Sequence, residues 1–164
     1  MTRAYYLLIG VGVFALDQAS KAWVLATVPF GDAREVTSWF SIIHWHNAGG
    51  LFGLMDRLPD AARVAVFLLL PVAGVAFLGF LFLKANRPAE LALLSAILGG
   101  ALGNLVDRVR FGAVVDFLDF HIPGGPSWPA FNVADSCLST GIILFLLLTL
   151  TKKKEGGGRA PDSV

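Results

Sequence analysis

Four apolar segments, each long enough to cross a lipid bilayer, constrain the fold of this chain more than any other feature. They cover approximately residues 4–28, 63–83, 89–107 and 129–151. About 20 apolar residues in a helix cover the roughly 30 Å hydrocarbon core of a bilayer, since each residue adds about 1.5 Å. Inside lipid, only helices and closed barrels satisfy every backbone polar group. The sequence therefore predicts an all-α membrane protein with four transmembrane helices.

The composition agrees with this prediction and excludes several other classes. Of the 164 residues, 55% are hydrophobic and only 15% are charged, which argues against a disordered chain or an ordinary soluble domain. The net charge of +1 gives no general attraction for nucleic acid. The length fits one membrane-embedded domain over 1–151, followed by a flexible basic tail over 152–164.

The basic residues of the short loops predict the orientation of the helices. The N-terminus, the turn over 84–90 and the tail after Thr151 are rich in Lys and Arg. These three segments share one side if four helices alternate in direction, so both termini are expected to be cytoplasmic. The loops over 29–62 and 109–128 then lie on the outer side.

The two outer loops are expected to contain structure of their own. Residues 35–47, EVTSWFSIIHWHN, are β-branched and aromatic, which predicts extended strand at the membrane surface. Residues 51–63 mix apolar and charged side chains, which is typical of a short helix lying in the interface. Trp39, Trp45 and Trp128 suit a belt of aromatic residues at the level of the lipid headgroups.

Ionisable side chains within a bilayer are expected to mark a functional site. Asp17 and Lys21 are four residues apart on the first helix, so they share a face and can pair. The remaining polar residues lie at the outer ends of the last two helices or between them: Asn104, Asp107, Arg108, Asp116, Asp119, Asn132 and Asp135. With the orientation above, all of these residues fall at one level, and they predict a site near the outer membrane surface.

Several of these polar residues also have simpler explanations. Asp17 and Lys21 are interpreted first as a structural ion pair, because each neutralises the other. The segment GGALG at 99–103 is a pattern of small residues that favours close helix packing. Asp107 and Arg108 can be ordinary interface anchors, although Arg108 could equally hold a substrate carbonyl or phosphate.

The histidines and the cysteine offer weaker candidates. His44 and His46 stand two positions apart on the expected strand and could in principle bind a metal. No third ligand stands near them in the sequence, so an interfacial role is favoured and neither a metal site nor a cofactor is expected. The single cysteine, Cys137, lies in apolar sequence without a nearby histidine, which favours a packing role over a nucleophilic one.

Asp116 and Asp135 remain, and apolar residues bound both of them. Two carboxylates brought together in a poorly hydrated site cannot both ionise easily, so one pKa rises and the pair shares a proton. The ionised member can take a proton from water, while the protonated member polarises a carbonyl and later protonates a leaving amine. This pattern predicts hydrolysis of a peptide bond by two aspartates. Asp119 would point to the opposite face of an extended segment from Asp116.

A second class of function uses the same residues. A small proton- or ion-conducting membrane protein could use Asp17, Asp107, Asp116 and Asp135 as a relay. A relay should place ionisable groups along the full depth of the membrane, whereas the inner halves of the last three helices contain none. Hydrolysis is therefore favoured, and a purely structural scaffold would leave the aspartates unexplained.

Five motifs, taken in order, carry a resemblance to a known family. They are DQASK at 17–21, NAGGLFG at 47–53, GGALGNLVDR at 99–108, VVDF at 114–117 and FNVAD at 131–135. From about residue 5 to residue 151, the chain resembles lipoprotein signal peptidase, the type II signal peptidase of bacteria. The resemblance implies an aspartic endopeptidase of the inner membrane, with both termini cytoplasmic and its active site near the outer surface.

The resemblance also implies substrates, partners and a fold. The substrates would be prolipoproteins that carry diacylglyceryl on a cysteine, cut just N-terminal to that cysteine. Substrates and membrane lipids would be the partners of a monomeric protein without a cofactor or bound nucleic acid. Residues 35–47 would belong to an extracytoplasmic β-cradle, and part of 51–62 would form an outer helix.

The motif positions imply roles for individual residues. Asp116 and Asp135 would be the catalytic pair. The residues expected to line the site and position the substrate are Asn47, Asn104, Arg108 and Asn132. Three further motif residues would have supporting roles: Asp17, Lys21 and Gly49.

Overall fold

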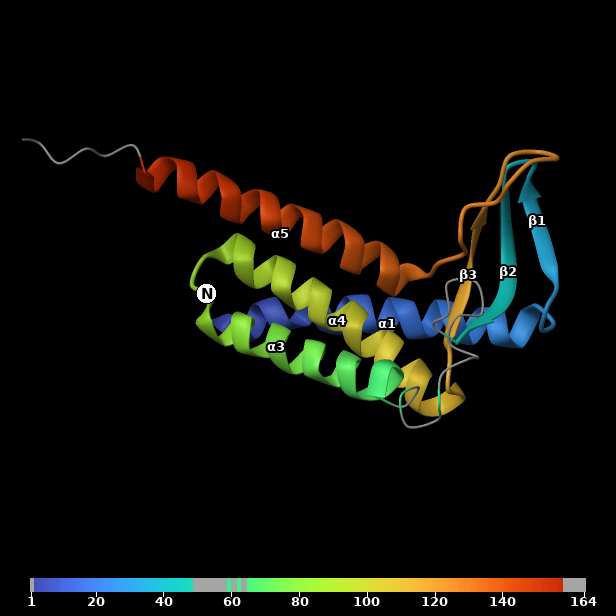
Figure 1. The fold of residues 1–164 in the computed structure, drawn as a ribbon, viewed down its shortest axis with the longest axis horizontal. Helices are drawn as coiled ribbons and strands as arrows, with labels where there is room; N and C mark the ends of the chain where they lie inside the picture. The colour runs from blue at the N-terminus through green and yellow to red at the C-terminus, as the bar shows by residue number, and fades with distance from the viewer. Residues whose placement is uncertain (1, 49–58, 60–61, 63–64, 158–164) are drawn as a thin grey trace, which may run out of the picture.

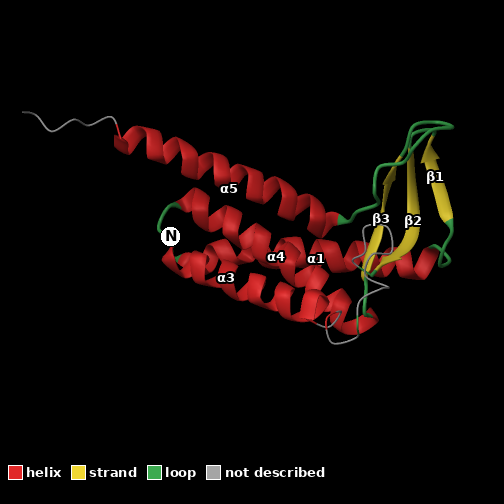
Figure 2. Cartoon of the chain, viewed as in Figure 1, coloured by secondary structure: helices red, strands yellow, loops and turns green. Residues whose placement is uncertain are grey.

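Four long helices and a three-stranded sheet make up the described part of the chain (Figure 1, Figure 2). The structure, a computed structural model, describes residues 2–48, 59, 62 and 65–157. The helical elements are α1 (Arg3–Thr27), η2 (Ala65–Leu69), α3 (Leu70–Lys84), α4 (Pro88–Phe111) and α5 (Val133–Gly157). The strands are β1 (Ala33–Thr37), β2 (Phe40–Asn47) and β3 (Val114–Phe120).

The predicted fold class, a four-helix membrane protein with a small sheet, is confirmed. Four helical segments are long and apolar enough to cross a bilayer: Arg3–Thr27, Ala65–Lys84, Pro88–Phe111 and Val133–Thr151. The second of these includes η2, a π-helical turn that continues directly into α3. The outer helix expected within 51–62 lies outside the described residues, which include only Pro59 and Ala62 of that range.

Helix α4 is the centre of the bundle, because it packs against α1, α3 and α5. Its small residues let the neighbouring backbones approach. Gly99 faces Gly10 of α1 so closely that a Cβ at Gly99 would overlap the Gly10 carbonyl group. Gly10 N also donates to Ser95 Oγ at 3.1 Å, and a Cβ at Gly100 would lie 2.9 Å from the Ala134 carbonyl oxygen of α5. Close helix packing at these small residues, as the sequence predicts, is confirmed.

The outward faces of the helices expose large apolar side chains. On η2, α3 and α5 these include Leu69, Leu70, Phe77, Phe80, Leu83, Ile143, Leu146, Leu147 and Leu150. Patches of this extent are rare on proteins that face water, whereas lipid accepts them without loss. The exposed faces therefore agree with a bundle that is surrounded by acyl chains.

The sheet lies at one end of the bundle, where α1 ends and α5 begins (Figure 1). Its strand order is β1-β2-β3 and both pairs are antiparallel, so the extended structure expected over 35–47 is confirmed. Phe40 of β2 stands opposite Phe120 of β3, and Asn47 stands opposite Val114. The register of this pair shifts between Ile42 and Trp45, so one extra residue of β2 is accommodated there.

Both ends of the last membrane helix differ from the sequence-based boundaries. The last membrane helix begins at Val133 rather than near 129, because Phe131 pairs with β3 instead. Leu118 N donates to Phe131 O at 2.8 Å, and Phe131 N donates to Leu118 O at 3.1 Å. At its other end, α5 continues to Gly157, beyond the expected end at 151.

Helix α4 also continues past its expected end at 107, as far as Phe111. Gly112 then ends the helix with a left-handed backbone, φ 68°, a conformation that glycine adopts without steric penalty. Asp107 and Arg108 therefore lie within the helix, where their side chains can reach neighbouring elements.

Gly99→Ala is expected to lower the thermal unfolding temperature, because the added methyl group overlaps the backbone of α1 at Gly10. The matched control is Gly79→Ala in α3, where a Cβ would have no heavy atom within 4 Å. That change should leave stability unchanged or raise it, since Ala is a better helix former than Gly by about 1 kcal/mol. Thermal unfolding of both purified variants in detergent tests the packing. Equal unfolding temperatures for the two variants would contradict it.

Candidate active site

Asp116 of β3 is buried at the junction of the sheet and the helix bundle, with 2% of its surface exposed. Both of its carboxylate oxygens accept hydrogen bonds from asparagine amides. Asn132 Nδ2 donates to Asp116 Oδ1 at 2.8 Å, and Asn47 Nδ2 donates to Asp116 Oδ2 at 2.9 Å. A neutral amide on each oxygen holds the carboxyl group in place without neutralising its charge.

Asp135 lies in the first turn of α5 and makes a matching set of contacts. Asn104 Nδ2 donates to Asp135 Oδ1 at 2.7 Å, and the backbone N–H of Asn132 donates to Asp135 Oδ2 at 3.3 Å. In return, Asp135 N donates to Asn132 Oδ1 at 2.9 Å. This exchange is a capping box. Asn132 stands just before the helix and Asp135 in its first turn, and the side chain of each accepts a hydrogen bond from the backbone N–H of the other. The start of α5 therefore fixes Asp135.

Asn132 joins the two carboxyl groups, because its amide touches Asp116 and its backbone touches Asp135. The two carboxylates are close enough to affect each other's ionisation. Burial, and to a smaller extent the charge of Asp135, raise the pKa of Asp116, while the Asn47 and Asn132 amides and the charge of Lys21 lower it, and the net pKa is about 6. Asp116 therefore binds a proton more readily than an exposed aspartate does.

Beneath the carboxyl pair, Lys21 of α1 forms a buried ion cluster. Its Nζ lies 2.8 Å from Asp17 Oδ2 and 2.7 Å from Asp107 Oδ2. The ion pair predicted between Asp17 and Lys21 is confirmed, but the cluster is larger than the sequence indicated. The interpretation of Asp107 as an interface anchor is wrong, because only 1% of its surface is exposed and its partner lies on another helix.

Lys21 also sets the orientation of Asn104. Its Nζ donates to Asn104 Oδ1 at 2.9 Å, and an ammonium group can only donate. The Asn104 atom that faces Lys21 is therefore the amide oxygen, which leaves Nδ2 to donate to Asp135. Lys21 therefore fixes the orientation of the Asn104 amide, so that Asp135 accepts a hydrogen bond from its N–H group.

The two carboxylates of the cluster reach the backbone on either side of the aspartate pair. Asp17 Oδ1 accepts a hydrogen bond from Ala134 N in the first turn of α5 at 2.9 Å. Asp107 Oδ2 accepts one from Val115 N in β3 at 3.1 Å. Ala134 and Val115 are the sequence neighbours of Asp135 and Asp116. The ion cluster therefore positions both strand and helix at the residues next to the pair.

Gln18 is a member of this cluster that sequence reasoning missed. Its Nε2 lies 3.1 Å from Asp107 Oδ1 and 3.2 Å from the carbonyl oxygen of Gly103. Its position beside Asp17 in the DQASK motif was the only signal in the sequence, and an uncharged side chain next to an ion pair is easily taken for a solvated one.

Arg108 lies beside the pair with unused hydrogen-bonding capacity. Its NH1 group donates to the Asn104 carbonyl oxygen at 3.2 Å, and its charge acts on Asp135, Asp107 and Asp116. Its Nε atom is buried and has no hydrogen-bond partner among the described residues. Because a buried unpaired donor is unfavourable, this atom is available to an oxygen that a substrate would supply.

Three further candidates from the sequence are Asp119, Cys137 and Gly49. Asp119 pairs with His121, whose Nδ1 lies 3.0 Å from Asp119 Oδ2. Cys137 is half-buried in α5, and Gly49 lies outside the described residues. Within the described ranges, no group of three or more His, Cys, Asp or Glu side chains is arranged to hold a metal ion.

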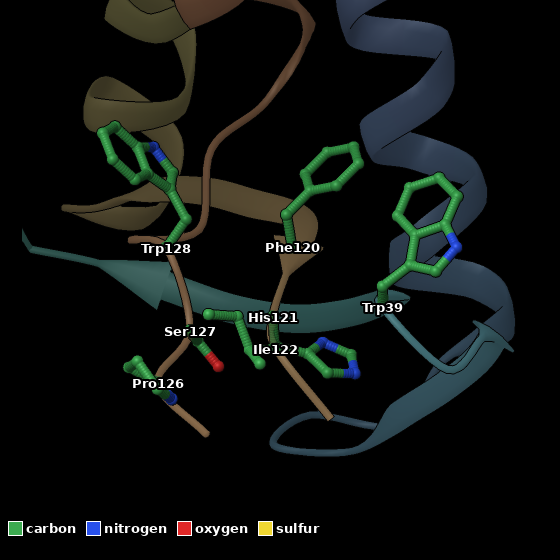
Figure 3. A pocket seen from close by; sticks show the side chains of 7 residues that line it. All are labelled: Trp39, Phe120, His121, Ile122, Pro126, Ser127 and Trp128. Atoms are coloured by element: carbon green, nitrogen blue, oxygen red, sulfur yellow. The ribbon is translucent and has the colours of Figure 1, made fainter. Parts of the chain in front are cut away.

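An apolar pocket of about 480 Å³ lies beside the end of β3 at Phe120 (Figure 3). Its lining residues are Trp39, Phe120, His121, Ile122, Pro126, Ser127 and Trp128. The indoles of Trp39 and Trp128 are 54% and 70% exposed, which suits contact with lipid headgroups. None of these lining residues carries a carboxylate, so the pocket is not part of the site.

Loss of the Lys21 charge is expected to destabilise the protein strongly. Lys21→Met leaves two carboxylates buried without their cation, and breaking a buried ion pair in this way costs about 3–5 kcal/mol. The control is Lys84→Met at the end of α3, where the side chain is exposed. Thermal or denaturant unfolding in detergent measures both. Similar unfolding midpoints for wild type and Lys21→Met would show that the cluster contributes little.

Comparisons with known proteins show the family to which the chain belongs. The family model described as signal peptidase (SPase) II matches residues 9–151. The lipoprotein signal peptidase of Anaplasma phagocytophilum is 40% identical over 143 residues, covering 87% of this chain and 90% of that protein. The lipoprotein signal peptidase of Burkholderia ambifaria is 39% identical over 144 residues, covering 87% of this chain and 86% of that protein.

Two solved structures of bacterial membrane enzymes have the same fold, each with a TM-score of 0.78. The first is 30% identical and covers 98% of this chain and 94% of the other. The second is 33% identical and covers 90% of this chain and 93% of the other.

Proposed function

The chain belongs to the signal peptidase II family, and we propose that it removes signal peptides from prolipoproteins with Asp116 and Asp135 as its catalytic pair. It is an aspartic endopeptidase and a multi-pass membrane protein. The observation that carries the proposal is the shared contact of both carboxyl groups with Asn132. Two buried carboxyl groups held by one residue fit general acid–base chemistry on a single water molecule.

The proposed reaction begins with one proton shared between the two carboxyl groups. The ionised member removes a proton from water, and the water oxygen attacks the carbonyl carbon of the scissile peptide bond. The protonated member donates a hydrogen bond to the carbonyl oxygen, which gains negative charge as the tetrahedral intermediate forms. When the C–N bond breaks, the proton taken from water passes to the leaving nitrogen. The pair thereby returns to its starting protonation state.

The asparagines have a defined part in this reaction. Asn47, Asn104 and Asn132 donate N–H groups to the carboxyl oxygens, and such bonds favour the ionised form. Burial opposes ionisation, so the two effects together keep one carboxylate charged and the other protonated. Because amides do not titrate, the asparagines influence this balance without changing their own charge.

The proposed orientation places the site at the outer membrane surface. The N-terminus lies beside the α3–α4 turn at the end of the bundle opposite the sheet: Arg3 donates to Leu83 O at 2.7 Å and to Asn86 Oδ1 at 2.9 Å. The basic residues of these two segments favour the cytoplasm under the positive-inside rule. The sheet and the aspartates then face the outer compartment.

A substrate that carries lipid fits this position. Its acyl chains can stay in the bilayer against the apolar helix faces while the scissile bond lies at headgroup level beside Asp116 and Asp135. The cleaved bond would be the one N-terminal to the diacylglyceryl-modified cysteine. The unpaired Nε of Arg108 is suited to a carbonyl oxygen of the bound peptide or of its lipid esters.

Asp116→Asn and Asp135→Asn are each expected to lower kcat for cleavage of a lipid-modified prolipoprotein by roughly 10³-fold or more, because neither amide can exchange the shared proton. Asp119→Asn is the matched control, since Asp119 lies on the same strand but pairs with His121. The control should cleave at nearly the wild-type rate. Near-wild-type turnover by a folded Asp116→Asn or Asp135→Asn variant would exclude the proposed pair.

The pH profile tests the contact of Asn47 with Asp116. As the pH rises through the upper pKa of the pair, the shared proton is lost and kcat/KM should fall. Burial raises the pKa of Asp116 and the Asn47 hydrogen bond lowers it, and the net pKa is about 6. Asn47→Ala should therefore raise this pKa and move the alkaline limb of the profile to higher pH.

The control for this profile is Asn86→Ala at the opposite end of the bundle. It removes an asparagine amide without touching the aspartates, so the alkaline limb should stay where it is in wild type. An alkaline limb that does not move in Asn47→Ala, or that moves to lower pH, would contradict the role assigned to Asn47.

A further inference from the structure

His44 and His46 of β2 form a pair that the proposed reaction does not use. Their Nε2 atoms lie 3.3 Å apart, and their ring centroids are 5.2 Å apart with an interplanar angle of 57°. The rings therefore converge through the same nitrogen on one point between them. The chain has 3 histidines in all, and the third, His121, pairs with Asp119 instead.

The hydrogen bond of His44 determines which of its nitrogens can bind a ligand. Its Nδ1 lies 2.8 Å from the carbonyl oxygen of Val28, and a carbonyl oxygen only accepts. Nδ1 therefore carries the proton, and Nε2 of the neutral ring presents a lone pair toward His46. Histidines that bind metals are commonly oriented in this way, with the other ring nitrogen donating to a backbone carbonyl.

Aromatic neighbours hold both imidazoles in this arrangement. Phe30 contacts the edge or face of His44 and His46, with centroid distances of 5.4 and 5.2 Å. Phe111 lies against His46 at 5.7 Å. His44 itself is only 6% exposed, so its ring has little freedom to turn away. The pair is thus preorganised by contacts that do not involve a ligand.

The separation of the two nitrogens fits one metal geometry. Zinc binds imidazole nitrogen at about 2.0–2.1 Å with tetrahedral angles, which places two such nitrogens about 3.3 Å apart. The right angle of a square-planar site would place them about 2.9 Å apart. Without an ion, the same two atoms form an N–H···N hydrogen bond at 3.3 Å, in which His46 Nε2 donates to the lone pair of His44 Nε2. A bound cation would take the place of that proton, as metal binding to histidine does.

We propose that His44 and His46 bind a divalent cation of the zinc class through their Nε2 atoms. Two protein ligands leave two tetrahedral positions to water, so the site is open and its cation exchangeable. The sequence argued against a metal because the spacing offered only two donors, and it could not show that these two converge. His46 directly precedes Asn47, which contacts Asp116, so an ion here would stiffen the end of the strand that holds the aspartate pair.

Zinc titration of the full-length, tag-free protein in detergent tests this site. After dialysis against a chelator, ZnCl₂ is added in a calorimeter. One Zn²⁺ ion per chain is expected to bind the wild type. His46→Gln should bind at least tenfold more weakly, because one of the two ligands is lost. His121→Gln is the matched control and should bind like the wild type.

Thermal unfolding supplies a second measurement in case a variant is poorly folded. Zinc should raise the unfolding temperature of the wild type and of His121→Gln, since a ligand that binds only the folded state stabilises it. It should not raise that of His46→Gln. Absence of binding to the wild type at millimolar Zn²⁺, or equal binding by His46→Gln, would overturn the proposal. Neither measurement depends on catalysis, so failure of the metal-binding proposal would leave the peptidase assignment unchanged.

Discussion

The buried ammonium group of Lys21 is the interaction on which the rest of the structure depends. It neutralises one carboxylate from its own helix and one from α4, and these carboxylates in turn hold backbone N–H groups at Ala134 and Val115. One cation on α1 therefore fixes α4, β3 and the start of α5 relative to each other. In a low-dielectric interior, such a cluster is stable only when all of its members are present.

Between the ion cluster and the aspartate pair lies a layer of neutral amides. Asn104 accepts from Lys21 on one side and donates to Asp135 on the other, and its oxygen also accepts from Asn132 at 3.2 Å. These amides fix the orientation of the side chains on both sides of the layer. They do not transfer protons, because amides do not titrate. The protein can thus keep fixed charges directly beneath two carboxyl groups whose protonation changes in the proposed reaction.

The sequence predicted the helices and strands better than the tertiary contacts between them. Apolar length identified the four helices, and the isolation of Asp116 and Asp135 among apolar residues singled out the pair. The role of Asp107 was missed because its partner, Lys21, lies on another helix. The late start of α5 was missed for a similar reason, since Phe131 pairs with Leu118 of β3, a partner that the residues around Phe131 do not indicate. Local patterns do not encode such tertiary contacts.

The extra residue in β2 determines which side chain of that strand lies next to Asp116. Residues opposite each other in an antiparallel pair point to one face, so the register beyond the shift, in which Trp45 opposes Asp116, turns Asn47 toward the carboxyl group. If the register of Phe40 and Phe120 continued unbroken, every side chain of the following segment would change face. The imidazoles of His44 and His46 would then lie on the face of Asp116 in place of the Asn47 amide. A single-residue insertion or deletion in this strand would thus exchange a neutral partner for a titratable one, and relatives that differ there in length would differ in acid–base behaviour as well as in shape.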